Sequence, residues 1–357
     1  MQCQLIPATA VQPSHLERWR DLVRRAAEPN PWFEPSVLVP LSKIQNDIGL
    51  LVAARGPTWH LCLPLMRMRR KWAGIEIDGW TTPHPVGTPL ADAVEAEEAL
   101  RCALRWLARA EGPRVLSIRA LDTEAPLTAI VARALGEDWR CKPLVEGAAW
   151  PAMRRRKAPT YLDERVSPKQ RHNIQRLRRR LEERLGSALR LVDRGGDVAA
   201  MDRFIALEAA GWKGRKGTAL ACDTARAGYF RAVCSGFAAD RRFRLYCLEA
   251  GGRAVAMKAM TRAGNALVEL RVAYDEGLAR FSPGVQLEVD AIEAFHGDDS
   301  LAVAVSHTNY AESPLFRIWP DRIETSGITA GCAGAGRQAL ASLLGIGSAR
   351  KDGTWPA

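Results

Sequence analysis

The 357-residue sequence lacks any uninterrupted apolar run near the roughly 18 residues that a membrane-spanning helix requires. Its first residues, MQCQLIPATAVQPSHLERW, also lack the basic segment followed by an apolar core that marks a secretion signal. Hydrophobic residues make up 47% of the chain and charged residues 25%, which is typical of a globular protein. These features predict a cytoplasmic protein, and they leave open a function at a membrane surface.

Metal and disulfide chemistry have little support in the sequence. Eight cysteines are scattered without C-x-x-C spacing, and several stand inside apolar runs, such as Cys62 in HLCLPL and Cys247 in RLYCLEA. Cysteines in such runs usually behave as small buried hydrophobes. The six histidines show no metal-ligand spacing either. The sequence therefore predicts no disulfide framework and no metal site.

Excess positive charge is scarce outside one segment. The net charge is +11, but residues 151–190 alone carry thirteen Lys or Arg against four Asp or Glu. A basic helix is predicted over Lys169–Arg184, and no aromatic residues interleave its cations, so the usual stacking platform for single-stranded nucleic acid is missing. An anionic polymer, an anionic membrane surface or an RNA stays open as its partner, with nucleic acid disfavoured. The alternative is a helix whose charged face is exposed to solvent and whose leucines pack against the rest of the protein.

The length favours two domains over one. In the first half, the pattern predicts paired strands over Gly49–Ala54 and Thr58–Met66, a long helix over Ala91–Ala110, and a further strand and helix. In the second half, Ser167 caps a helix that begins with Pro168 and ends at Gly186. The halves share a similar order of elements, which suggests a duplicated α/β fold with a mixed sheet.

The stretch from Ala266 to Leu287, ALVELRVAYDEGLARFSPGVQL, predicts a buried strand, a polar loop, a Pro-Gly turn and a helix start. A helix N-terminus just past a strand presents free backbone N–H groups and a positive dipole end, which suit a phosphate or pyrophosphate. Strands over Phe243–Glu249 and Ala254–Thr261 precede it. This order is that of the core of an acyl-CoA-dependent N-acyltransferase. The alternative is an ordinary strand-to-helix turn.

Several blocks resemble the acetyltransferase domain of the CelD-type proteins, a branch of the GNAT superfamily linked to bacterial cellulose and exopolysaccharide production. The blocks GWKG-x-x-GTA, within residues 207–220, and AYDE-x-x-x-x-SPG, within residues 272–288, are long enough to be specific. In the first half, NPWFEP (30–35) and GTPLAD (87–92) add to the resemblance. It also extends to the Fem peptidyltransferases, which have a tandem architecture and a basic helical segment.

The resemblance implies two GNAT-like domains, of which the second carries acyl-CoA. The expected organisation is a degenerate GNAT-like domain over 1–150, a basic linker over 151–166, an acetyltransferase domain over 167–325 and a flexible tail over 326–357. Acetyl-CoA or another acyl-CoA is the implied co-substrate, and a small or polymeric amine is the acceptor.

The expected pyrophosphate loop departs from the usual Q/R-x-x-G-x-G/A pattern of the family, because it reads Arg280-Phe281-Ser282-Pro283-Gly284-Val285. Pro283 has no N–H, so one potential phosphate donor is missing. The remaining donors are expected at Ser282, Gly284, Val285 and Gln286, and Phe281 completes the predicted cofactor-binding set.

N-acyl transfer needs a base for the amine proton and an acid for the leaving thiolate. Glu208 lies on the apolar side of its predicted helix, so we expect burial to raise its pKa towards that of a useful base. Tyr274 is the candidate general acid at the end of the strand, and Asp275 is a further catalytic candidate beside it. The alternatives are an edge carboxylate paired with an arginine, and loop carboxylates in water.

Further residues are predicted to contact the acceptor. Trp212 and Lys213 stand in the GWKG block, and Glu276 could bind a cationic amine together with Asp275. Glu269 is another such candidate. It lies inside its strand, and Arg271 at i+2 is expected to share its face, so that the two form a structural pair, with a catalytic role of Glu269 as the alternative. The remaining substrate-binding candidates, which precede the last strand and could equally form a turn, are Asp299 and Ser300.

Three functional hypotheses follow from these patterns. The first is an acyl-CoA-dependent N-acyltransferase, with acetyl as the first choice of acyl group. The second is a Fem-like aminoacyl transferase whose basic helix holds tRNA. The third is a non-catalytic accessory protein of a polysaccharide pathway.

Overall fold

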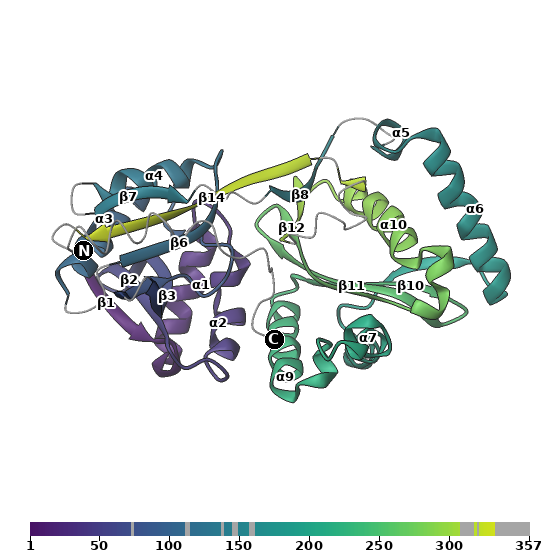
Figure 1. Ribbon diagram of the computed structural model, residues 1–357, viewed down its shortest axis with the longest axis horizontal. Coiled ribbons are helices and arrows are strands. Elements are labelled where there is room, and N and C mark those ends of the chain that lie inside the picture. The colour runs from purple at the N-terminus through teal and green to yellow at the C-terminus, as the bar shows by residue number, and fades with distance from the viewer. Residues whose placement is uncertain are drawn as a thin grey trace. The chain divides into compact units, whose positions relative to one another are not determined.

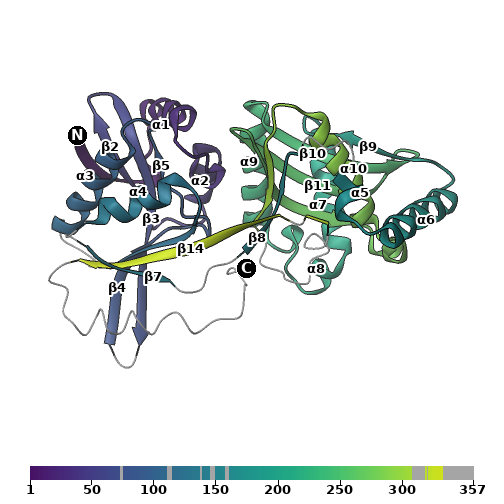
Figure 2. The same ribbon diagram turned by 90° about the horizontal axis from the view of Figure 1, so that it is seen from above.

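The computed structural model describes residues 1–72, 75–110, 115–136, 139–144, 149–156, 161–307, 318–319 and 321–332. These residues fall into two compact units, one within 1–149 and 323–332 and the other within 150–322 (Figures 1 and 2). None of the described helices combines the length and the apolar character needed to cross a membrane.

The first unit is built on a mixed sheet. Its strands lie in the spatial order β1, β2, β3, β4, β6 and β14, with β5 paired to β3 and β7 paired to β14. Its elements are β1 (Gln2–Pro7), η1 (Ala8–Ala10), α1 (Pro13–Arg25), η2 (Pro31–Phe33), α2 (Pro35–Leu41), β2 (Ile48–Arg55), β3 (Thr58–Trp72), β4 (Ile75–Thr81), β5 (Leu90–Ala91), α3 (Ala96–Arg109), β6 (Val115–Asp122), α4 (Pro126–Leu135), β7 (Trp139–Leu144) and β14 (Asp321–Cys332).

The core of the first unit lies between this sheet and helix α3. Leu100, Leu104 and Leu107 recur at helical spacing and are buried, while the strand β2 is buried along nearly its whole length. Trp19 of α1 is fully buried as well, and its indole N–H donates to the carbonyl oxygen of Phe33 at 3.0 Å. The apolar stripe of α3 thus gives the first unit its own core.

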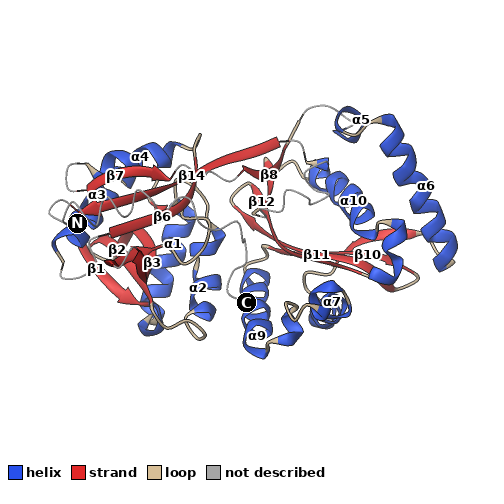
Figure 3. Cartoon of the chain, in the orientation of Figure 1, coloured by secondary structure: helices blue, strands red, loops and turns tan. Residues whose placement is uncertain are grey.

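The second unit also has a mixed sheet, in which β12 and β13 are parallel and the other neighbouring strands are antiparallel (Figure 3). The spatial order is β8, β13, β12, β11, β10 and β9. Its elements are β8 (Ala149–Arg154), α5 (Tyr161–Arg165), α6 (Pro168–Leu185), β9 (Leu189–Asp193), α7 (Val198–Ala210), α8 (Trp212–Arg215), η3 (Leu220–Cys222), α9 (Thr224–Ala239), β10 (Phe243–Ala250), β11 (Arg253–Ala263), β12 (Ala266–Tyr274), η4 (Glu276–Phe281), α10 (Pro283–Gly297) and β13 (Val303–Ser306).

Helices cover both faces of this second sheet, with α6 and α10 on one face and α7 and α9 on the other (Figure 1). Helix α6 begins and ends as the sequence predicts. The hydroxyl of Ser167 accepts from the backbone N–H of Gln170, whose side chain bonds back to the N–H of Ser167, and Gly186 ends the helix with a φ of 67°.

The predicted linker over 151–166 is wrong for the described part of that segment. Residues 149–154 form β8, which pairs antiparallel with β13, and residues 161–165 form α5. The run PAMRRRK looks polar, but Ala152 and Met153 are buried because they sit in a strand of the sheet.

The predicted flexible tail is wrong for residues 326–332, while 333–357 lie outside the described residues. Residues 326–332 belong to β14, which pairs with β6 and β7. Their small side chains fit a crowded sheet, and Ala330 and Cys332 are buried. A composition rich in Gly, Ala and Ser therefore did not indicate looseness here.

Candidate active site

Strand β13 pairs with only part of the length of β12. The parallel pairing extends from Ala266 opposite Val303 to Glu269 opposite Ser306. Strand β12 continues to Tyr274 and stays paired with β11, whereas β13 ends at Ser306. The backbone of β12 after Glu269 therefore has an edge that β13 does not cover. An uncovered strand edge offers N–H and C=O groups to an extended ligand.

A bulge in β12 begins at the same point. Opposite β11 the register shifts between Ala259 and Met260, so that these residues face Arg271 and Glu269 with one residue of β12 left over. Because an extra residue reverses the alternation of side chains, Glu269 and Arg271 point to opposite faces of the sheet. The expectation that they share a face and pair with each other is wrong.

On the α7 face, the carboxylate of Glu208 gathers three donors. Its Oε1 accepts from Lys213 Nζ at 2.8 Å and from Arg271 Nε, and its Oε2 accepts from the backbone N–H of Leu220 at 2.9 Å. Lys213 also donates to the carbonyl oxygen of Val272 at 3.0 Å. The Glu208 side chain is only 1% exposed. This network joins helix α7, strand β12 and the segment Gly211–Gly214, called the GWKG loop, most of which lies in the short helix α8.

The electrostatics of this network differ from the expectation for Glu208. Burial by itself raises the pKa of Glu208, but the hydrogen bonds and charges of Arg271 and Lys213 outweigh it and hold the pKa below the usual range. The predicted upward shift is therefore wrong. Burial is the main reason that the pKa of Lys213 is lowered, and Glu208 offsets only part of that effect.

The GWKG loop is held tightly against its surroundings. A Cβ on Gly214 would lie 1.8 Å from the carbonyl oxygen of Ala209, and one on Gly211 would lie 2.8 Å from Oε1 of Glu276. Residue 214 therefore requires glycine, because its contact is with backbone, whereas a side chain at 211 would displace the end of the Glu276 side chain. The Glu276 carboxylate accepts from the backbone N–H of Trp212 and from Arg215, and both contacts lower its pKa, Arg215 more strongly.

On the α10 face, three charged side chains form a buried cluster that sequence reasoning missed. Lys258 of β11 is fully buried and pairs with Glu269 at 2.8 Å and with Glu288 of α10. Its Nζ also lies 4.6 Å from the ring centre of Trp319. Ser306 donates its hydroxyl to Glu269 at 3.1 Å. The cluster therefore sits where β12 and β13 separate, and burial raises the pKa of Glu288.

The turn into α10 uses most of the N–H groups expected to bind pyrophosphate. Ser282 adopts the left-handed region with a φ of 54°, and its N–H donates to Ala279. The N–H groups of Val285 and Gln286 donate to the carbonyl oxygen of Ser282 at 2.9 and 3.1 Å. These three donors are thus engaged within the turn, which corrects the prediction.

Gly284 is the exception in this turn, because its N–H has no hydrogen-bond partner among the described residues. The other predicted members of the cofactor set point elsewhere. Phe281 is buried in the apolar core, and the side chain of Gln286 donates to the carbonyl oxygen of Ile174 in α6.

Comparisons with known proteins identify the region that contains these residues. Residues 168–303 match the acetyltransferase (GNAT) domain. The second unit therefore has a GNAT acyltransferase fold. No curated protein matches the sequence.

Solved structures extend the similarity over the chain. FemX is 10% identical with a TM-score of 0.59, covering 96% of this chain and 100% of FemX. L-PGS from Bacillus licheniformis is 11% identical with a TM-score of 0.51, covering 93% and 95%. The C-terminal domain of a lysylphosphatidylglycerol synthetase-like protein from Agrobacterium fabrum is 13% identical with a TM-score of 0.54, covering 92% and 94%. At these identities the similarity shows the fold alone, and it confirms the predicted tandem GNAT-like fold.

At the end of β12 in the GNAT domain, the predicted residues have different surroundings. Tyr274 lies beside the start of α10, because a Cβ on Gly284 would stand 3.7 Å from its ring. Asp275 caps η4 through the N–H of Gly277 and pairs with Arg253 at 2.6 Å. Both Asp275 and Glu276 already have arginine partners, so a cationic amine would have to compete with these arginines.

Asp299 and Ser300 lie at the other end of β12. Ser300 accepts from Arg262 Nη1 at 2.9 Å, and Ala302 donates to Asn265 at 2.8 Å, just before β12 begins. The nine residues of β12 place this turn roughly 25 Å from Tyr274. Asp299 is bound by Arg155. The structure therefore does not bring these two residues together with the rest of the site.

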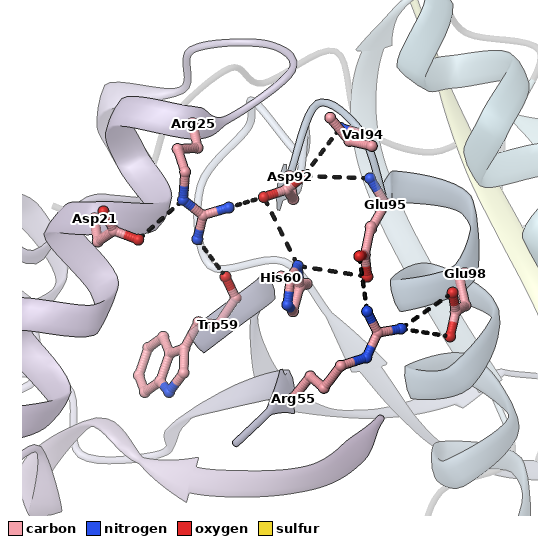
Figure 4. Close-up of polar contacts among 9 residues, drawn as sticks. All are labelled: Asp21, Arg25, Arg55, Trp59, His60, Asp92, Val94, Glu95 and Glu98. Atoms are coloured by element: carbon pink, nitrogen blue, oxygen red, sulfur yellow. Dashed lines mark hydrogen bonds and ion pairs between the residues drawn. The ribbon is translucent and has the colours of Figure 1, made fainter. Parts of the chain in front are cut away.

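The first unit contains a comparable strand-to-helix turn, and its start is already occupied by a carboxylate (Figure 4). Oδ1 of Asp92 accepts from the N–H groups of Val94 at 2.9 Å and Glu95 at 3.2 Å, just before α3. Arg25 pairs with the same carboxylate, and Nδ1 of His60 lies 3.7 Å from it. An internal anion thus takes the donors that a phosphate would need there.

Proposed function

We propose that the GNAT domain is an acyl-CoA-dependent N-acyltransferase, with acetyl-CoA as the first donor to test and an amine as acceptor. The observation that carries the proposal is the edge of β12 that β13 leaves unpaired after Glu269, together with the N–H of Gly284 at the start of α10, which has no partner among the described residues. The match of residues 168–303 to the GNAT domain supports it. Because the Asp92 carboxylate already occupies the corresponding turn of the first unit, the acyl-CoA donor is placed in the second unit.

In this proposal Tyr274 protonates the leaving thiolate, because it stands between the β12 edge and the turn. The proton acceptor is placed at Glu269 rather than Glu208. Glu208 is held ionised by three donors, whereas Glu269 and Glu288 share one lysine and carry one net negative charge when both are ionised. Burial raises the pKa of Glu288, the other carboxylate of this cluster, whereas the pKa of Glu208 is lowered by its donors.

The donor site is tested by calorimetric titration of the protein with acetyl-CoA. We expect binding in the micromolar range, and we expect Gly284→Glu to abolish it, because a carboxylate at the helix start repels a diphosphate. A Cβ on residue 284 would make only an ordinary van der Waals contact, so the fold should tolerate the change. Gly297→Glu, at the other end of α10, is the matched control and should bind normally. Unchanged binding by Gly284→Glu would contradict the proposed site.

The base is tested with an amine that the wild-type protein acetylates. We expect Glu269→Gln to lower kcat/KM by about 100-fold while acetyl-CoA binding is retained, because general-base catalysis contributes about 10²–10⁴. Glu208→Gln is the matched comparison and should keep a substantially higher activity. If Glu208→Gln lowered kcat/KM more than Glu269→Gln, the base would be Glu208 instead.

A Fem-like transfer from aminoacyl-tRNA is the second candidate, and the basic helix favours it. Among the described residues, no partner is found for the side chains of Lys169, Arg179, Arg180 and Arg184, all exposed on α6. The same titration is therefore run with tRNA. Binding that falls steeply with salt, without acetyl-CoA binding, would favour this candidate.

The biological setting is proposed from the CelD-type resemblance alone, and it is exopolysaccharide or cellulose production. A protein that binds neither acetyl-CoA nor tRNA would instead fit an accessory role in such a pathway. Fold does not determine the acceptor, so an amine screen follows a positive titration.

A further inference from the structure

A small pocket opens beside the end of β12, on the α7 face. Its lining comes from the C-terminal part of α7, the GWKG loop and the last residues of β12 with the loop that follows. The residues that line it are Leu207, Glu208, Gly211, Trp212, Lys213, Val272, Ala273, Tyr274 and Glu276. The pocket therefore contacts the part of β12 that precedes the proposed donor turn.

The charges around this pocket do not balance. Lys213 and Arg271 both donate to the same oxygen of Glu208, so one carboxylate faces two cations. At the rim, Glu276 is matched by Arg215. Among the described residues, the Lys216 side chain has only the ring of Trp212 as a partner, and the ring centre lies 5.2 Å from its Nζ. The surroundings of the pocket thus carry an excess of positive charge.

Lys213 and Arg271 both keep N–H donors that have no partner among the described residues. An ammonium group has three N–H donors, and Lys213 uses two of them, for Glu208 and for Val272. Arg271 uses Nε for Glu208 and Nη2 for the carbonyl oxygen of Thr218, which leaves Nη1. Half-buried cations with unused donors favour a second anion.

Burial adds to this preference. The Lys213 side chain is 21% exposed, and its pKa is lowered chiefly by burial although Glu208 is in contact. The carboxylates of Glu208 and Glu269, which both favour the charged form of Lys213, therefore do not compensate its charge fully. A bound anion would do so, and Trp212, which is 38% exposed, is among the residues that line the pocket.

We propose that this pocket binds an acidic group of the acceptor, a carboxylate or a phosphate, so that the acceptor is an amine that also carries negative charge. The inference rests on the proposed function, because it uses the acyl transfer to decide what enters the pocket. It assigns Glu208 the task of holding Lys213 and Arg271 in place. Lys213 is then the residue that selects the acceptor.

The test uses amine pairs that differ in one acidic group, L-lysine with cadaverine and O-phosphoethanolamine with ethanolamine. Each is titrated calorimetrically into the protein, with and without saturating CoA. We expect at least one acidic member to bind about tenfold or more tightly than its partner, as one charge-assisted hydrogen bond allows. Which pair shows the preference distinguishes carboxylate from phosphate.

The variants then locate the preference. Lys213→Met should remove it, Lys213→Arg should retain it, and Lys169→Met on α6 should leave it unchanged. Thermal melts confirm that each variant is folded. Equal binding of both members in each pair, no binding at all, or a preference that survives Lys213→Met would each overturn the inference.

Failure of the proposed function gives a different pattern. If acetyl-CoA does not bind but the acidic amines still show a preference that depends on Lys213, the acyltransferase proposal fails and the anion pocket stands. If acetyl-CoA binds and is turned over without any preference for acidic amines, only the pocket inference fails.

Discussion

Replacing Lys258 with methionine is expected to lower the free energy of unfolding by about 3–5 kcal/mol, the usual effect of removing one partner from a buried ion pair. Methionine fills much of the same volume, so the loss would come from charge and not from a cavity. Without the lysine, Glu269 and Glu288 would face each other with no cation between them. Urea unfolding at neutral pH measures the change.

Two further measurements separate charge from packing at this position. Glu288→Gln in the Lys258→Met background should recover part of the loss, because it removes one of the two uncompensated carboxylates. The deficit of the single variant should also shrink as the pH falls, since protonation of a carboxylate has the same effect. Lys169→Met on the exposed face of α6 is the control, expected within about 0.5 kcal/mol of wild type. A loss at Lys258 no larger than in this control would contradict the buried cluster.

Local signals in the sequence were sufficient for several elements of the fold. Ser167, Pro168 and Gly186 predict both ends of α6, because capping depends on residues within one turn of the helix. The order of strand, turn and helix from Ala266 onwards is equally local. The polar pair Asp275-Glu276 marks the end of the strand, and the Pro283-Gly284 pair marks the start of the following helix.

Contacts between distant residues could not be predicted in this way. The alternation of a strand predicts that Glu269 and Arg271 share a face, but a single bulged residue sends them to Lys258 and Glu208 instead. Nothing in the sequence near Glu269 indicates that bulge, since it depends on pairing with β11. Lys258 itself stands inside the apolar run AVAMKAM, and a lone lysine there was a usable signal of a buried ion pair.

The bulge also gives β12 two different chemical faces. On the α10 face, two carboxylates surround one lysine, which suits proton uptake. On the α7 face, two cations surround one carboxylate, which suits an anion. Strand β13 pairs with β12 only up to Glu269, so both groups lie beside the part of β12 that β13 leaves unpaired. That arrangement is what joins the proposed base at Glu269 to the proposed acceptor contact at Lys213.

Replacing Glu208 with alanine is expected to lower the free energy of unfolding by about 3–5 kcal/mol, because two cations and the N–H of Leu220 lose their shared acceptor in a buried site. Glu208→Gln should lose less, since the amide oxygen can still accept a hydrogen bond. Urea unfolding of both variants measures the difference. Glu183→Ala on the exposed face of α6 is the control and should stay within about 0.5 kcal/mol of wild type.

The advantage of wild type over Glu208→Gln should depend on pH in one direction. The folded protein holds the pKa of Glu208 below the ordinary glutamate value of about 4.3, so the folded state binds this proton less readily than the unfolded state. The stability that the carboxylate contributes is therefore fully present above that value, and it is lost as the pH falls through the folded pKa. The free energies of unfolding of wild type and Glu208→Gln should differ at pH 7 and become equal as the pH falls into the acid range. A difference that stays constant or grows on acidification would mean that Glu208 is not held ionised by Lys213 and Arg271.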